Sequence, residues 1–284
     1  MPGEFDQHRP MLFALAYRML GSASDAEDIV QEAWLRWERT NNVERPRSWL
    51  ASVVSNLCID QLKSARSRRE QYVGPWLPEP LVIDQSPLAD EKTELAESVS
   101  MAFLVLLESL SPLERAVFLL REVFDYDYAE LAQILGRSEE SCRQLLSRAR
   151  SYLKDKRPRF ETNEQEQQQI VGRFLQAAMS GDLKGLESLL AQNAVALSDG
   201  GGKRHAARVP VIGAAKIAKF VLGIARVNTE ELEYRFGRVN HQPALLLYSK
   251  GEPYSVQMFS IENGKIARIH SVLNPDKLRA IPSL

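Results

Sequence analysis

The chain has 284 residues, of which 44% are hydrophobic and 26% are charged, enough to build the packed cores of two or three small domains. Its formal net charge of −1 excludes a protein that attracts polyanions over its whole surface. The sequence lacks both an apolar run of the ~18–20 residues that cross a bilayer and a basic-then-apolar leader, so we expect no membrane partner.

The two cysteines, Cys58 and Cys142, both fall in apolar helical stripes. We therefore expect small core residues rather than a disulfide or a metal site. This usage fits a reducing, cytoplasmic setting.

The first part of the chain predicts two amphipathic helices. Residues 8–20 form the first, which ends at Gly21, and Ser24 caps the second with Glu27 at the third position of a capping box. The predicted buried stripe of the second helix is Ile29, Ala33, Trp34 and Trp37. The opposite side is Asp28, Gln31, Glu32 and Arg36. Periodicity alone favours a solvated surface for that polar side.

A long helix is predicted from Ser48 to about Gln71. Its apolar positions follow a helical spacing: Leu50, Val53, Val54, Leu57 and Leu62. Asn56 and Asp60 lie four residues apart on one side, and the helix ends in the basic stretch KSARSRRE beside Tyr72. Basic side chains near an aromatic ring suit a nucleic-acid backbone with stacked bases. A solvated helix end, favoured by the helix dipole, is the plainer explanation of the same charges.

Residues 73–97 are predicted to be a linker. The stretch VGPWLPEPLVIDQSP holds four prolines and one glycine, so it forms neither a helix nor a central strand. Trp76, Leu77 and Leu81 are nevertheless large apolar side chains, whereas a free linker is polar. We therefore expect this linker to pack on another surface. Helix resumes over residues 94–110, and Pro112 opens the next helix after Ser111.

Residues 128–154 predict a helix-turn-helix. Gly136 follows the first helix, where the chain must reverse, and Ser138 caps the second. The inner stripe of the second helix is Cys142, Leu145, Leu146 and Ala149. Its outer side is Arg143, Gln144, Ser147, Arg148 and Arg150. Many helical hairpins carry a glycine turn and solvated charges. Here, however, residues 137–159 hold eight basic and three acidic side chains, including the Arg and Gln types that read base edges in the major groove.

After residue 160 the chain changes character. Helices are predicted over roughly 164–179, 182–191 and 213–226, and strand-like runs follow: AVALS, ELEYRFGRV, ALLLYS, YSVQMFSIE and KIARIHSVL. Asn263-Gly264 between two of these runs is a type I′ hairpin signal. Helices followed by antiparallel strands indicate an α+β domain.

The stretches DAEDIVQEAWLRW and PRSWLASVVSNLCIDQLKSARSRR, followed by the helix-turn-helix, resemble bacterial RNA polymerase sigma factors of the extracytoplasmic-function (ECF) type in the sigma-70 family. The resemblance covers residues 5–155. It implies that Asp28, Gln31 and Glu32 contact the polymerase clamp. The implied −10 contacts are Asn56, Asp60, Lys63, Arg66, Arg68 and Arg69. The implied −35 contacts are Ser141, Arg143, Gln144, Ser147, Arg148, Arg150 and Lys154.

The last block resembles the SnoaL-like family, whose α+β fold curves a sheet around a pocket. Three short motifs strengthen the resemblance: WLPEP at 76–80, DGGGK at 199–203 and NPDKL at 274–278. Together they resemble one ECF subgroup, often called SigJ-like, in which a SnoaL-like domain is fused to the sigma factor.

We expect the second and third motifs to clasp the linker in place of a separate anti-sigma factor. The residues of this clasp are Trp76, Leu77, Pro78, Glu79, Pro80, Asp199, Gly200, Gly201, Gly202, Lys203, Asn274, Pro275, Asp276, Lys277 and Leu278. The alternative is that all three motifs are merely turns of their own domains.

The predicted fold is multi-domain, with two all-α sigma domains followed by an α+β domain. The boundaries are 1–72 for sigma region 2, 73–97 for the linker, 98–160 for sigma region 4 and 161–284 for the SnoaL-like domain. The expected partners are RNA polymerase core and promoter DNA, with room for a small ligand in the C-terminal pocket.

We expect no enzymatic activity, metal or cofactor. Candidate catalytic groups in the last domain do not form a defensible pair: Asp199, His205, Tyr234, His241, Tyr248, Tyr254 and His270. The competing class is a helix-turn-helix regulator with a ligand-binding domain, against which the DAED–VQE helix argues.

Overall fold

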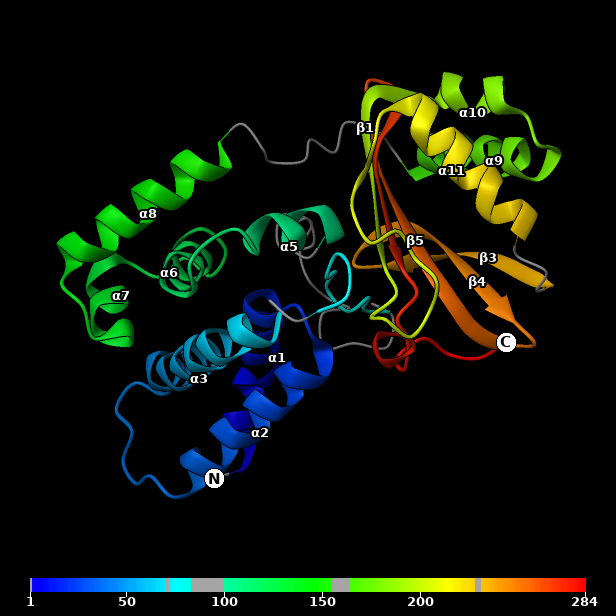
Figure 1. Cartoon of the computed structure of the whole chain (residues 1–284). Coiled ribbons are helices and arrows are strands. Elements are labelled where there is room, and N and C mark those ends of the chain that lie inside the picture. Colours follow the sequence, from blue (N-terminus) through cyan, green and yellow to red (C-terminus); the bar gives the residue numbers. More distant parts are fainter. Residues whose placement is uncertain (1, 70–71, 83–99, 155–163, 228–230) are drawn as a thin grey trace. The chain divides into compact units, whose positions relative to one another are not determined.

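Figure 1 shows the computed structural model of the chain, which describes residues 2–69, 72–82, 100–154, 164–227 and 231–284. The chain divides into two compact units, residues 1–71 with 84–157 and residues 72–83 with 158–284. Residues 72–82, here named the linker segment, thus belong to the second unit. No helix in the described ranges is long and apolar enough to cross a membrane.

The first unit begins with three helices, α1 (Pro2–Leu20), α2 (Ala23–Glu38) and α3 (Pro46–Arg69). Helix α1 starts earlier than the predicted residue 8 and keeps Pro10 in its interior. The cause is Phe5, which is 2% exposed and anchors the turns before the proline.

The turn between α1 and α2 differs from the prediction in its cap. Gly21 ends α1 with a φ of 69°, a conformation that glycine adopts without strain. The N-cap of α2 is Ser22, whose hydroxyl accepts a hydrogen bond from the Asp25 amide at 3.2 Å. The predicted cap, Ser24, is therefore wrong, because the helix begins directly after the reversal at Gly21.

Four further helices of the first unit lie in its described residues: α5 (Met101–Leu107), α6 (Pro112–Glu122), α7 (Tyr128–Leu135) and α8 (Glu139–Leu153). Gly136 separates α7 from α8 with φ 61° and ψ 42°, in the left-handed region, and Ser138 caps α8. The structure therefore confirms the helix-turn-helix and its turn. The predicted helical residues 94–99 lie outside the described residues.

Buried and partly buried arginines join α1 and α3 to the later helices of the first unit. Arg115 on α6 is 2% exposed and donates from Nη1 to the Met19 carbonyl at 2.5 Å and to Glu108 at 2.7 Å. Desolvation lowers the pKa of Arg115 to about 9. Arg47 donates to the Phe124 carbonyl at 3.0 Å. The helices of the two predicted sigma regions thus pack together within this unit.

In its described residues, the second unit combines three α-helices with a six-stranded sheet. The helices are α9 (Glu164–Ser180), α10 (Leu183–Leu189) and α11 (Ala214–Val227), followed near the end by the short 3-10 helix η2 (Pro275–Lys277). The strands are β1 (Leu190–Asp199), β2 (Val211–Ile212), β3 (Leu232–Val239), β4 (Gln242–Ser249), β5 (Glu252–Glu262) and β6 (Lys265–Val272). Their order is β2-β1-β6-β5-β4-β3, and β1 runs parallel to β6. The predicted α+β class is confirmed.

Tight turns with positive φ join the antiparallel strands. Asn263 and Gly264 have φ of 51° and 69°, which confirms the predicted type I′ turn. Asn240 and His241, with φ of 53° and 55°, make an equivalent turn between β3 and β4 that the sequence pattern did not reveal. The signal was weak because histidine replaces the usual glycine at its second position.

The central part of the sheet is buried on both faces. Ala196, Leu245, Phe259 and Ile269 share one core with α9, α10 and α11, which gather on one side of the sheet in Figure 1. Strand alternation directs Asp199, Leu246, Val256 and Val272 to the other face, and these side chains are at most 7% exposed. The linker segment contributes Leu77 and Leu81, which are 0% and 6% exposed. The second face is thus named the linker face.

His270 on the linker face generates a prediction about pH. It is 2% exposed, and burial, with a smaller contribution from Arg268, lowers its pKa to about 3. Above pH 6.5 the histidine is neutral in both the folded and the unfolded chain. Below that pH the unfolded chain binds a proton that the folded chain does not, so the free energy of unfolding falls by up to about 1.4 kcal/mol per pH unit.

We expect thermal melts of the full chain between pH 7 and pH 5 to show this loss, and His270→Leu to reduce it. His205→Leu, at an exposed histidine of the same unit, is the control and keeps the wild-type slope. Equal slopes for wild type and His270→Leu would contradict the assignment.

Candidate functional site

Asp199, the last residue of β1, is the centre of a polar cluster around the linker segment. Its carboxylate is fully buried and accepts hydrogen bonds from the Tyr72 hydroxyl at 2.6 Å and from the Leu77 amide at 2.8 Å. It also accepts from the Gly201 amide at 3.0 Å and from the Lys277 ammonium at 2.7 Å. A buried carboxylate needs such pairing, because moving a charge out of water costs on the order of several kcal/mol when no partner compensates it.

Lys277 connects the NPDKL motif to the same cluster. Its ammonium also donates to the Leu77 carbonyl and lies 4.1 Å from the centre of the Trp76 ring. This cation–π contact is partly shielded from water, which strengthens it. Asn274 donates to the Tyr72 hydroxyl at 2.9 Å and caps η2. Burial, followed by the hydrogen bond to Asp199, raises the pKa of the Tyr72 phenol.

The glycines of the DGGGK motif allow neighbouring groups to lie close to the backbone of this loop. A Cβ at Gly201, whose φ is 58°, would come within 2.3 Å of the Asn274 side chain. A Cβ at Gly200 would meet the Arg204 carbonyl oxygen at 2.3 Å. Lys203 closes the motif with an ion pair to Asp276, which lowers the pKa of that carboxyl. The structure thus brings WLPEP, DGGGK and NPDKL together.

The linker segment has a second anchor that sequence reasoning missed. The Asn240 amide donates to the Leu81 carbonyl at 2.9 Å, and the Leu81 amide donates to the Asn240 side chain at 3.1 Å. Val82 forms an isolated antiparallel bridge with Val239. Asn240 is fully buried, and a buried Asn in a hairpin turn is the signal that could have located this anchor.

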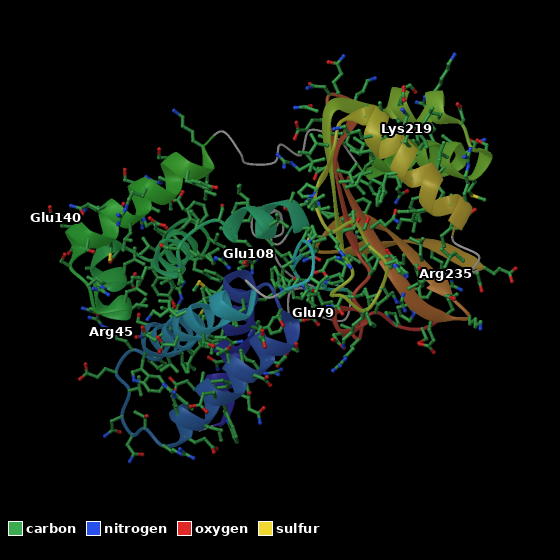
Figure 2. The ribbon with its side chains drawn as sticks, viewed as in Figure 1. Arg45, Glu79, Glu108, Glu140, Lys219 and Arg235 are labelled. Carbon is green, nitrogen blue, oxygen red and sulfur yellow. The ribbon has the colours of Figure 1, made fainter. Side chains whose placement is uncertain are left out.

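The other predicted clasp residues lie in the linker segment or in the DGGGK and NPDKL motifs. Leu77, Pro78, Glu79 and Pro80 form a continuous buried run, with Glu79 at 7% exposure and labelled in Figure 2. Leu278 is 3% exposed, whereas Asp276 is exposed beside Lys203.

The outer side of α8 carries the predicted base-reading side chains. All of the following are exposed: Arg143, Gln144, Ser147, Arg148, Arg150 and Lys154. Three of the arginines pair with glutamates: Arg143 with Glu139 at 2.8 Å, Arg148 with Glu114 at 3.5 Å and Arg150 with Glu122 at 2.7 Å. Exposed pairs of this kind contribute at most about 1 kcal/mol, so a nucleic acid could displace them at little cost. Ser141 is half-buried in the first turn of α8.

The predicted −10 residues on α3 divide into two groups. Asn56, Asp60 and Lys63 are exposed, and Lys63 pairs with Asp60 at 3.0 Å. Ser52, one turn before Asn56, donates to the Ile134 carbonyl of α7 at 2.7 Å. The α7 end of the helix-turn-helix therefore lies against this side of α3. The side chains of Arg66, Arg68 and Arg69 fall outside the described residues.

Helix α2 differs from the prediction at Trp34. Its ring is 36% exposed, although the sequence pattern assigns it to the buried stripe. It lines a groove of about 320 Å³ between α1 and α2, together with Phe5, Arg9, Glu27, Val30 and Gln31. The physical reason is position: Trp34 lies at the border of the stripe, where a large ring reaches the surface. The predicted clamp contacts Asp28 and Gln31 are exposed, and Glu32 pairs with Arg36 at 2.8 Å.

The candidate catalytic groups of the second unit do not converge on one point. Asp199 is occupied by the linker segment, His270 is buried and His205 is exposed. The ring of Tyr254 lies 4.4 Å from the Arg204 guanidinium. Within the described part of the chain, no group of three His, Cys, Asp or Glu side chains is placed to hold a metal ion.

Two family models match the chain. Sigma-70 region 2 matches residues 5–68, and a Sigma-70 region 4 model matches residues 100–153. The first covers α1 to α3, and the second covers α5 to α8. The matched ranges thus contain the groove at Trp34, the exposed side of α3 and the outer side of α8.

Relatives extend the similarity to the whole chain. ECF RNA polymerase sigma factor SigJ of Mycobacterium tuberculosis is 38% identical over 98% of this chain and 93% of its own length. The probable ECF RNA polymerase sigma factor SigI of the same species is 34% identical over 96% of this chain and 94% of its own length. The crystal structure of SigJ superposes with a TM-score of 0.79, at 34% identity, and covers all of both chains.

Proposed function

Because the chain belongs to the ECF sigma factors of the sigma-70 family, non-enzymatic subunits that direct RNA polymerase to promoters, we propose that its α+β domain regulates this activity by holding the linker between the two sigma regions. The observation that carries the proposal is the buried carboxylate of Asp199, which binds both the linker backbone at Leu77 and the linker aromatic Tyr72. The clasp replaces a separate anti-sigma factor, and the protein acts in the cytoplasm.

The matched regions support a proposed surface for each partner. The polymerase core binds at the exposed side of α2 around Asp28, Gln31 and Glu32, next to the groove at Trp34. The −10 element meets α3 at Asn56, Asp60, Lys63 and the following arginines. The −35 element meets the outer side of α8, where Arg143 and Gln144 reach base edges and Lys154 meets phosphate.

The closed packing of the first unit supports a regulated state. The −10 and −35 elements are separated by roughly 25 base pairs, about 85 Å of duplex at 3.4 Å per base pair. A unit in which Ser52 of α3 bonds to Ile134 of α7 does not span that distance. The two regions must therefore separate before both promoter elements are bound.

The linker sets how far they separate. An extended chain reaches about 3.3 Å per residue, so an unbound linker over residues 73–97, about 25 residues, would span roughly 80 Å. A linker segment held at Asp199 and at Asn240 contributes only its fixed end-to-end length. Release of the clasp thus lengthens the tether, and this is the regulated step that we propose.

The polymerase assignment is tested by Gln31→Ala combined with Glu32→Ala. Gln31 is exposed, and Glu32 loses one exposed ion pair, so the free energy of unfolding changes by about 0.5 kcal/mol or less. We expect binding to polymerase core, measured by co-elution and by run-off transcription, to fall sharply. Lys184→Ala, exposed on α10, is the control. Unchanged core binding by the double variant would remove these residues from the interface.

The clasp is tested by a double-mutant cycle on transcription. Trp76→Ala and Asp199→Ala both detach the linker segment, because Lys277 contacts the ring of the one and the carboxylate of the other. We expect both to change run-off transcription in the same direction, with a non-additivity of roughly 0.5–3 kcal/mol in the double variant. Protease cleavage within residues 72–82 should rise in each single variant. Additive effects on transcription, with cleavage unchanged, would end the proposal.

A further inference from the structure

Strand β3 (Leu232–Val239) forms one edge of the sheet, next to β4 in the order β2-β1-β6-β5-β4-β3. Its residues 233–236 are all exposed. Val239, at the end of β3, forms a bridge with Val82 on the outer side of the strand. Among the described residues, no strand pairs the outer side of residues 232–236. An open edge of this kind presents a template for another strand.

The hairpin fixes which backbone groups of β3 point outward. The two-residue turn at Asn240 and His241 makes Val239 and Gln242 a hydrogen-bonded pair. Alternate residues back along the strand, 237, 235 and 233, therefore bond to β4. Residues 232, 234 and 236 direct their amides and carbonyls away from the sheet. The Asn240 amide, in phase with this second set, donates outward to Leu81.

The edge strand β3 exposes aromatic side chains on one face of the sheet and charged side chains on the other. Tyr234 and Phe236 are 43% and 46% exposed and lie on the helix side, since they pair with Leu247 and Leu245. Glu233 and Arg235 lie on the linker face, opposite Tyr248 and Leu246. Figure 2 labels Arg235 at the outer strands of the sheet. Charged side chains usually protect an edge against pairing. Opposite charges two residues apart, however, match an antiparallel copy of themselves.

We propose that β3 pairs with β3 of a second copy of this chain, antiparallel about a two-fold axis at Tyr234. This register sets Glu233 opposite the partner's Arg235 and Arg235 opposite the partner's Glu233. Both pairs occupy non-hydrogen-bonded positions, where opposite side chains approach most closely. On the other face Phe236 meets the partner's Leu232. The outward groups of residues 232, 234 and 236 all find partners.

Neighbouring registers are less favourable. An axis at Arg235 sets two guanidinium groups directly opposite each other, which is destabilising. An axis at Phe236 sets Glu233 opposite the partner's Val239, a residue already bridged to Val82, and loses both ion pairs. Charge therefore selects the Tyr234 axis. The interface is isologous, as a two-fold dimer requires.

The association is weak, because pairing along one strand buries less than the ~1,200 Å² that marks the low end of stable interfaces. The full chain is therefore studied by sedimentation and light scattering up to about 100 μM, where weak dimers of this class become visible. We expect the mass to rise twofold with concentration. This dimer is independent of the clasp, so its failure leaves the proposed regulation standing.

The register is tested by charge swaps. Glu233→Arg and Arg235→Glu each create two like-charge pairs and should leave the chain monomeric. The double swap, and an equimolar mixture of the two single variants, restore both ion pairs and should restore the dimer. Tyr234→Pro, which removes an outward amide while an edge position tolerates the ring, should also abolish dimerisation. Lys219→Glu on α11 is the control and keeps the wild-type mass.

Circular dichroism identical to wild type shows that each variant is folded. Dimerisation of the wild type, its loss in both single variants and its return in the double swap support the proposal. A wild-type monomer at every concentration overturns it. A dimer that survives both single swaps, or a double swap that stays monomeric, overturns it as well.

Discussion

The arrangement of the second unit depends on one buried carboxylate. Asp199 lies at the end of β1, where it loses its hydration and must be paired within the protein. Three sources supply the pairing: the linker segment, the glycine loop that follows β1 and the lysine of η2. Removal of a partner leaves a charge buried and uncompensated, which makes the linker a structural part of the domain that it crosses.

A buried charge of the opposite sign has a similar place in the first unit. Arg115 donates to the main chain of α1 and to Glu108, while its buried Nε makes no hydrogen bond in the part of the chain that is described. Desolvation is thus less fully compensated than at Asp199. Incomplete satisfaction suits the proposed opening of this unit, because opening returns the guanidinium to water. In the second unit the buried carboxylate that binds the linker segment is fully hydrogen-bonded. In the first unit the buried guanidinium that joins the helices is only partly hydrogen-bonded.

The sheet of the second unit is covered both on its helix side and on the linker face. Its helix side is filled by the core residues of α9, α10 and α11. Its linker face buries Leu77 and Leu81, and its candidate catalytic residues either bind the linker or lie in separate places. Among the described strands, the edge strand β3 keeps aromatic and charged residues exposed. Both proposed contacts thus lie on the outside of the fold, in segments that sequence patterns describe as loops and edges.

Local sequence determined most of the elements. Helical periodicity located α8 and its exposed arginines, Gly136 specified the turn of the helix-turn-helix and Asn263-Gly264 specified a hairpin, because each depends on residues near one another in the chain. Apolar residues in a proline-rich stretch predicted that the linker packs, since water disfavours exposed Trp76 and Leu77.

Tertiary structure decided which surface receives the linker and which charges meet. Tyr72, Asp199 and Lys277 are separated by up to about two hundred positions, and no periodicity relates them. The anchor at Asn240 and the contact of Ser52 with Ile134 likewise arise from long-range packing. Residue pattern reports which side chains must be buried, whereas the partner that buries them is selected by the shape of the folded chain.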